Sequence, residues 1–179
     1  MICKKGAGQM DENGIALPAE LTEAGFSLRG GILHREGAPR APRRAELPEG
    51  VRGIDGGCFS GCAELRELVL PASLREIGSA AFENCVSLGS VSIPEGVRRI
   101  RKNCFSGCVS LRRAELPRSL ESIGEWAFRG CAELREIYIP ASVTDIRAEA
   151  FLGCGKLRIL ADPGSPAAAF EEKRREVFR

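Results

Sequence analysis

Apolar residues recur at a fixed spacing of 23 residues through the middle of the chain. Five columns of apolar residues keep this spacing, and they begin at Pro48, Ile54, Phe59, Cys62 and Leu65. A constant period of this length, with apolar residues at constant phases, is typical of a solenoid. One repeat is too small to bury its apolar face alone, so we expect neighbouring repeats to stack and to bury that face between them.

The second repeat, residues 71–93, shows the elements that the pattern predicts. Its last residues have the form L-x-x-V-x-I, which predicts a short strand with alternate side chains directed inward. Proline follows and ends the strand, because it cannot donate to a ladder. Ala, Phe and Cys at i, i+1 and i+4 are compatible with one tight helical turn. The residue before the column cysteine is Gly in four repeats and Asn84 in this one, which indicates a left-handed backbone position.

The unit Pro-x-x-Val-x-x-Ile-x-x-x-Ala/Cys-Phe-x-Gly-Cys-x-x-Leu-x-x-Val/Leu-x-Leu resembles the BspA-like leucine-rich repeat, a bacterial and protist variant. The resemblance covers five copies, residues 47–161. It implies a leucine-rich repeat solenoid of right-handed coils, with a parallel β-ladder on one face and short helical turns on the other. It also implies a non-catalytic role, usually at the cell surface, in adhesion or protein binding.

A second periodicity doubles the first. Repeats one and three share Pro-Glu-Gly-Val-Arg, whereas repeats two and four share Ser-Leu-x-x-Ile-Gly. This alternation indicates that a unit of two coils was copied.

The segments on either side of the repeats lack the period. We expect residues 1–24 to be poorly ordered. In residues 25–46, alternating apolar residues flank a Gly-Gly pair, which predicts a capping hairpin followed by a basic loop. The five repeats occupy residues 47–161. Within 162–179, Ser165 followed by proline predicts the start of an amphipathic helix that caps the last coil.

Composition narrows the classes of partner. The chain has 179 residues, with 26 Lys and Arg against 24 Asp and Glu, so it has no broad field for nucleic acid or an anionic membrane. It has no apolar stretch long enough for membrane insertion.

Its first residues lack the apolar stretch of a signal peptide, so we expect it to stay inside the cell or to be a fragment. The resemblance instead suggests a cell-surface or secreted location, and the compartment stays open.

The eight cysteines follow the repeat. Five form a column, and Cys58 and Cys104 stand where other repeats have Ala, so the pattern predicts small buried sites; Cys3 lies outside it. Parallel side chains in register about 4.7–4.9 Å apart are farther apart than the roughly 3.8 Å Cβ separation of a relaxed disulfide. We therefore expect free thiols.

No constellation of residues indicates chemistry. His34 is the single histidine and has no nucleophile motif beside it. The pairs Cys58/Cys62 and Cys104/Cys108 lack the further ligands that zinc requires. No glycine loop of the phosphate-binding types is present. The sequence predicts no catalytic residue, no metal site and no cofactor, and therefore a protein that is not an enzyme.

The exposed side of the strands offers candidate contacts, because the third and fifth positions of L-x-x-L-x-L face outward. These positions hold Glu67, Ser90, Arg113, Glu136 and Ile159, and Val69, Ser92, Glu115, Tyr138 and Ala161. Tyr and Arg are enriched at binding hot spots, so Tyr138 flanked by Arg113 and Arg135 is the predicted contact centre. The alternative is that Arg113, Glu136, Glu115 and Glu67 form only a solvated lattice of cross-strand pairs. Trp126, which we expect on the outer face, is a second candidate contact or a cover for the glycine corner.

These observations predict a monomeric, non-enzymatic module that binds a protein or peptide along the strand face. The alternative is a structural spacer, or a piece of a longer surface array, with no ligand of its own.

Overall fold

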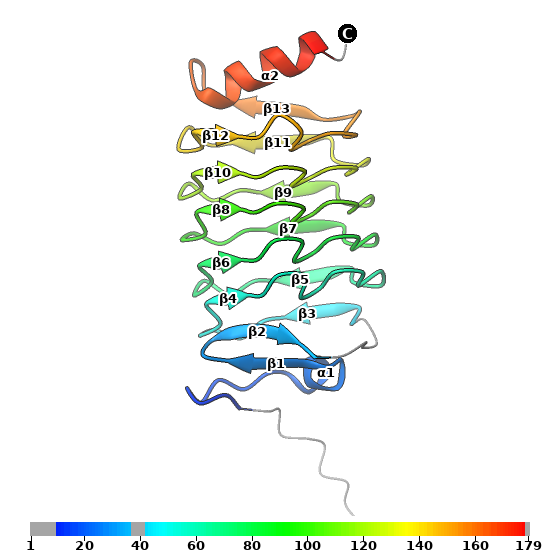
Figure 1. Cartoon of the computed structure of the whole chain (residues 1–179), viewed down its shortest axis with the longest axis vertical. Coiled ribbons are helices and arrows are strands. Elements are labelled where there is room, and N and C mark those ends of the chain that lie inside the picture. The colour runs from blue at the N-terminus through cyan, green and yellow to red at the C-terminus, as the bar shows by residue number, and fades with distance from the viewer. Residues whose placement is uncertain (1–9, 37–41, 178–179) are drawn as a thin grey trace, which may run out of the picture.

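The molecule is an elongated stack of coils with a hairpin at one end and a helix at the other (Figure 1). The computed structural model describes residues 10–36 and 42–177. We number the coils 1 to 5 from Pro48, Pro71, Pro94, Pro117 and Pro140.

The predicted parallel ladder forms along one side of the stack, here called the front ladder. Its strands are β3 (Arg44–Glu46), β5 (Glu67–Val69), β7 (Ser90–Ser92), β9 (Arg113–Glu115), β11 (Glu136–Ile139) and β13 (Arg158–Ala161). β3 pairs with β5, and β7, β9, β11 and β13 pair in order, all in parallel. From β3 to β11 the strands alternate in burial as the sequence predicts: Val91 is buried between exposed Ser90 and Ser92.

A second parallel ladder, the back ladder, lies on the other side of the coils (Figure 1). It consists of β4 (Gly53–Ile54), β6 (Glu76–Ile77), β8 (Arg99–Ile100), β10 (Ser122–Ile123) and β12 (Asp145–Ile146). Every strand ends on the isoleucine column, whose side chains enter the core. Strands of two residues are too short to show an alternating pattern, so the sequence did not predict this ladder.

The predicted helical turn is a series of single turns, and no helix forms within residues 53–161. In coil 2, the N–H of Glu83 donates back to the carbonyl of Ala80, at 3.0 Å. The N–H of Phe82 instead donates to the carbonyl of Cys104 in the next coil, at 2.9 Å. Alternate amides are thus used between coils, which prevents a continuous helical spiral. We call this row of inter-coil bonds the turn ladder.

Stacked phenylalanine rings form the centre of the core. From Phe59 to Phe151, neighbouring ring centroids are 5.2–5.4 Å apart and interplanar angles are 4–14°. Phe26 extends the stack at the N-terminal end, and Phe170 of the C-terminal helix extends it at the other. Such aromatic pairs contribute about 0.5–1.5 kcal/mol each beyond the area they bury.

The glycine corner has the predicted left-handed backbone. Asn84 has φ +57°, like the glycines at its phase in the other coils. The preceding corner is also left-handed in coils 1 to 4, where Gly57, Ala80, Asn103 and Trp126 have φ between +55° and +65°.

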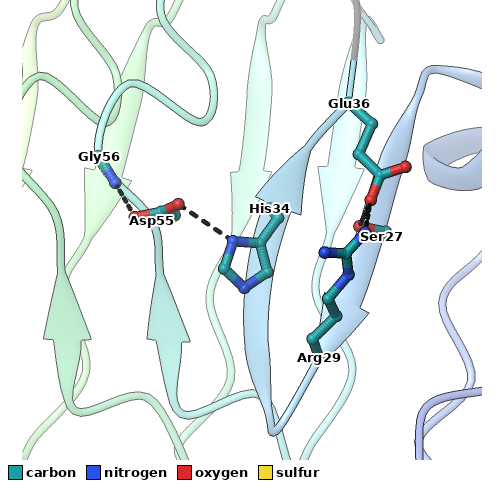
Figure 2. A network of polar contacts seen from close by, with 6 residues as sticks. All are labelled: Ser27, Arg29, His34, Glu36, Asp55 and Gly56. Carbon is teal, nitrogen blue, oxygen red and sulfur yellow. Dashed lines mark hydrogen bonds and ion pairs between the residues drawn. The ribbon is translucent and has the colours of Figure 1, made fainter.

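The N-terminal end is capped by the predicted hairpin. β1 (Phe26–Arg29) pairs antiparallel with β2 (Ile32–Arg35), and β2 pairs in parallel with β4. Figure 2 shows the polar contacts on this cap: Glu36 accepts hydrogen bonds from Ser27 and Arg29.

The expectation of a poorly ordered N-terminal segment was wrong from residue 10 onward; residues 1–9 lie outside the described residues. α1 (Ala19–Glu23) precedes the hairpin, and Leu17, Leu21 and Ala24 are buried. These few apolar residues are ordered by packing on the end of the core, which local periodicity does not reveal.

The predicted C-terminal helix is α2 (Pro166–Val177), which lies across the last coil (Figure 1). The hydroxyl of Ser165 accepts a hydrogen bond from the N–H of Ala168 at 3.2 Å, as expected of a helix cap. Arg174 on this helix donates to the carbonyl of Leu157 at 2.8 Å, which ties the helix to the coil.

The doubled period has a structural counterpart at the proline corner. The carboxylate of Glu49 in coil 1 accepts hydrogen bonds from the N–H groups of Ala72 and Ser73 in coil 2, at 2.9 and 3.1 Å. Glu95 clasps coil 3 to coil 4 in the same way. Between coils 2 and 3 this clasp is missing from the described structure, and β6 and β8 are not paired. The solenoid therefore consists of clasped pairs of coils, 1 with 2 and 3 with 4.

Candidate binding face

The predicted contact residues gather around one depression of about 550 Å³ on the front ladder. It is lined by Arg113, Glu115, Arg135, Glu136 and Tyr138, which are five of the seven predicted residues. Their meeting follows from the ladder, because Arg113 of β9 lies directly beside Glu136 of β11. Tyr138 is 47% exposed, so its side chain is accessible to a partner.

Ion pairs hold several of these side chains. Arg113 lies 2.7 Å from Glu115 on its own strand, and Glu136 lies 2.6 Å from Arg158 on the next. Exposed pairs of this kind contribute little to stability, about 0–1 kcal/mol. The cross-strand ion pairing that was the alternative interpretation of these residues is thus present for Glu136. Tyr138 takes no part in these ion pairs.

The lining has an excess of positive charge. Three arginines stand against the two carboxylates of Glu115 and Glu136. The third arginine, Arg112, was not among the predicted contacts; no carboxylate of the described residues lies within 4.0 Å of it, although its charge helps to lower the pKa of Glu133. A guanidinium in this state presents a planar fork of donors that fits a carboxylate.

A hydrogen bond orients the tyrosine. The hydroxyl of Tyr138 donates to the carboxylate of Asp162, at 3.0 and 3.1 Å from its two oxygens. This bond to Asp162 raises the pKa of Tyr138 above its ordinary value. Asp162 was not among the predicted contact residues, and the structure gives it a role in holding the ring.

The last strand corrects two predicted positions. Ile159 and Ala161 were expected to face outward, but Ile159 is buried and lies beside Ile137. Arg158 of β13 pairs with Glu136, 22 residues away, whereas Glu136 pairs with Arg113, 23 residues away, so the side chains of β13 change face relative to the repeat. Leu160 consequently lies beside Tyr138 and lines the depression, adding an apolar surface to it. Asp162 precedes Pro163 where the other repeats have an apolar residue before proline, and this is the signal that could have shown the shift.

Glu67 and Trp126 lie elsewhere. Glu67 is on β5, which does not pair with β7, and its carboxylate is 3.8 Å from Arg44. Trp126 stands at the left-handed corner of coil 4 with φ +57°, half-buried. Lys102 lies 4.5 Å from the centroid of its ring. The structure therefore gives Trp126 a cation–π contact within the chain and does not bring it to Tyr138.

The other candidate groups are accounted for by structural contacts. His34 Nδ1 lies 3.0 Å from the carboxylate of Asp55, which also accepts the N–H of Gly56 (Figure 2). These bonds, that of Gly56 foremost, hold the pKa of Asp55 below its ordinary value. The part of the chain that the structure describes holds no group of three His, Cys, Asp or Glu side chains placed to bind a metal ion.

The seven cysteines in the described residues are unpaired and buried. The thiol of Cys85 donates to the carbonyl of Phe59 at 3.2 Å, and the later column cysteines repeat this bond one coil on. Burial raises the pKa of Cys58 and Cys108 to about 12, so these thiols stay protonated near neutral pH. Cys3 lies outside the described residues.

A family model for the BspA type leucine-rich repeat region matches residues 43–158 in six copies. The chain belongs to this family. Five complete coils were predicted from the sequence; the front ladder of this leucine-rich repeat protein has six strands, because β3 precedes the first coil. The family is generally non-enzymatic.

Solved structures of bacterial leucine-rich repeat proteins are similar to the chain. One from Bacteroides ovatus is 35% identical over 77% of this chain and 39% of its own, with a TM-score of 0.68. A leucine-rich repeat protein from T. pallidum is 33% identical over 79% of this chain and 69% of its own, with a TM-score of 0.69. A leucine-rich cell surface protein from Faecalibacterium prausnitzii is 27% identical, with a TM-score of 0.70, over 91% of this chain and 39% of its own.

The chain thus spans well under half the length of two of these three proteins. No curated protein sequence matches it. Of the helices in the described residues, none is long and apolar enough to cross a membrane.

Proposed function

We propose that this leucine-rich repeat protein binds a protein or peptide segment on its front ladder, with Tyr138 at the centre of the contact. The observation that carries the proposal is the depression in which an oriented, half-exposed tyrosine, three arginines and Leu160 come together. An aromatic ring with arginines around it is the composition found at the centre of protein interfaces.

The chemistry of the depression favours a particular partner. Arg112 and the excess positive charge favour an acidic side chain, since a guanidinium can hold a carboxylate with two hydrogen bonds. The ring of Tyr138 and the side chain of Leu160 favour an apolar side chain next to it. The proposed partner therefore presents an acidic residue close to an aliphatic or aromatic one.

The family supports a role in interaction without naming the ligand. The F. prausnitzii relative is a cell surface protein by its description. We extend that location to this chain as part of the proposal, with adhesion as the form that binding would take there.

The test is capture from bacterial and animal cell lysates, followed by titration of the captured partner in purified form. The wild type is compared with the double variant Tyr138→Ala, Arg113→Ala. The matched control is Ser90→Ala, Ser92→Ala, which changes two exposed residues of the same ladder outside the depression. We expect the control to bind as the wild type does and the double variant to bind at least about tenfold more weakly. A partner that binds all three proteins with equal affinity would show that the binding site does not lie on this face.

A structural spacer is the second candidate. It is favoured by the ion pairs that already occupy Arg113 and Glu136, and by longer relatives of which this chain spans only a part. No partner in either lysate, with all variants folded, would favour this function.

A further inference from the structure

A cavity of about 620 Å³ separates the last coil from α2. Its walls are mainly apolar and include Ile146, Phe151 and Leu152 from the coil and Ala169 and Phe170 from the helix. Leu152 is 40% exposed and Ala169 is exposed, and both line the cavity. The helix thus covers the last coil incompletely.

The backbone along this cavity has unused donors. At each earlier boundary, the N–H of the column phenylalanine donates to the next coil: Phe59 to the carbonyl of Ala81 at 2.7 Å, and Phe128 to that of Ala150 at 2.8 Å. The corresponding N–H of Phe151 has no acceptor among the residues that the structure describes. The turn ladder therefore ends in a free donor beside the cavity.

The same edge has an unused acceptor. The carbonyl of Ile54 accepts from the N–H of Gly78 at 2.8 Å, and that of Ile123 accepts from Arg147 at 3.0 Å. β12 pairs only with β10, so the carbonyl of Ile146 has no such partner in the described chain. Donor and acceptor stand in the positions that coils 1, 3 and 4 use to hold their successors, whereas coil 2 uses only the donor.

We propose that this end of the solenoid binds an extended peptide segment that adds to β12 as a partial sixth coil. The site continues an interface that the chain already forms with itself after coils 1, 3 and 4, and those three copies define the occupant. It carries an isoleucine, valine or leucine over Ile146, a small residue opposite the N–H of Phe151, and an extended backbone between them. This is peptide recognition by strand addition to an exposed edge.

Phe170 limits how far the peptide extends. Its ring lies 6.1 Å from that of Phe151, tilted by 60°, and so takes the place of a sixth ring in the stack. The peptide accordingly ends, or turns away, before the phenylalanine position of a true coil. At the rim, Lys173 makes no ion pair within the described residues, and it favours an acidic residue or a terminal carboxylate at that end.

The probe is a fluorescein-labelled peptide with the sequence of residues 73–81, the segment of coil 2 that covers the same edge of coil 1. It is titrated against the full chain by fluorescence anisotropy. Two control peptides are matched to it: one is methylated on the amide nitrogen that corresponds to Gly78, and one has the counterpart of Ile77 changed to aspartate. The first removes the donor to Ile146, and the second places a charge in the apolar cavity.

Two protein variants complete the design. Ala169→Trp fills the cavity from an exposed position on α2, and Tyr138→Ala alters only the front ladder. We expect saturable binding to the wild type and to Tyr138→Ala, weakened at least about tenfold by Ala169→Trp and by either change in the peptide. The peptide controls need no protein variant, so the test stands even if Ala169→Trp does not fold.

Three outcomes would overturn the proposal: no saturation up to millimolar peptide, equal binding of the methylated peptide, or loss of binding in Tyr138→Ala alone. A fourth outcome that would overturn it comes from analytical ultracentrifugation of the chain without peptide. Dimerisation that Ala169→Trp abolishes would assign the cavity to a second copy of the chain instead of a peptide.

Discussion

Gly78→Ala should destabilise the protein, whereas Gly89→Ala, eleven residues further on, should not. A Cβ atom on Gly78 would lie 2.4 Å from the backbone nitrogen of Gly56 and 2.7 Å from the carbonyl carbon of Asp55. Both atoms belong to the backbone of coil 1, so no side chain can turn aside to make room. Gly89 has no atom within 4 Å of the same position and no positive φ.

The size of the effect follows from two opposing terms. Forcing extra atoms into a packed interior costs about 1–3 kcal/mol, and contact with backbone at 2.4 Å places this case near the upper end. Replacing glycine by alanine also restricts the unfolded chain, which stabilises the protein by about 0.4–1 kcal/mol. The net expectation for Gly78→Ala is a loss of about 2 kcal/mol. For Gly89→Ala only the second term applies, a gain of about 0.4–1 kcal/mol.

Urea unfolding, followed by the fluorescence of Trp126 and by far-UV circular dichroism, measures both free energies. Trp126 lies in coil 4, so coincident transitions would show that the coils unfold together and that a two-state analysis applies. A loss of about 2 kcal/mol corresponds to a fall in Tm of about 4–8 °C for a chain of this size. A Gly78→Ala variant as stable as Gly89→Ala would refute the inference that close approach of the coils requires this glycine.

Three further results are expected. The backbone N–H groups that bind Glu49 and Glu95 hold the pKa of each carboxyl below its ordinary value of 4.5. The ionised carboxylates therefore contribute their full stability above pH 4.5, and this contribution is lost as the pH falls through the lowered pKa. Between about pH 5 and 3, the free energy of unfolding in urea should fall less in the double variant Glu49→Gln, Glu95→Gln than in the wild type. Equal falls in the two proteins would contradict this. Near neutral pH, Cys58 and Cys108 should react with a thiol reagent only after unfolding, as mapped by mass spectrometry, and fast labelling of the native protein would show that they are not buried. Amide hydrogens of β8, which is not paired with β6, should exchange faster than those of β10, which is bonded to the coil before it; equal protection would contradict the missing pairing.

The apolar columns were enough to predict the front ladder, the buried cysteines and the glycine corner. They succeed because each repeat packs on the next in the same way, so a residue type that recurs at one position of the repeat indicates a buried position. The back ladder and α1 were beyond this method. A strand such as Glu76–Ile77 has no room for a pattern, and α1 is held by the packing of Leu17 and Leu21 on the end of the core.

The candidate binding face was predicted in part for the same reason. The 23-residue period places Arg113, Arg135 and Tyr138 near one another on neighbouring strands, as the structure has them. The apolar side of the depression was missed, because β13 pairs with β11 one residue out of the 23-residue register and Leu160 therefore changes face. A count by fixed period does not show a shift of register within a strand.

The clasp of Glu49 on coil 2, repeated 46 residues later by Glu95 on coil 4, has a consequence for how such proteins change length. Removing coil 2 alone would delete the N–H groups of Ala72 and Ser73 that Glu49 binds, and would bring the like charges of Glu49 and Glu95 to the same corner of neighbouring coils. Removing or copying 46 residues would keep every clasp matched. Unequal recombination within such a gene would thus preserve the clasps in steps of two coils, and in those products the front ladder would gain or lose two strands at a time.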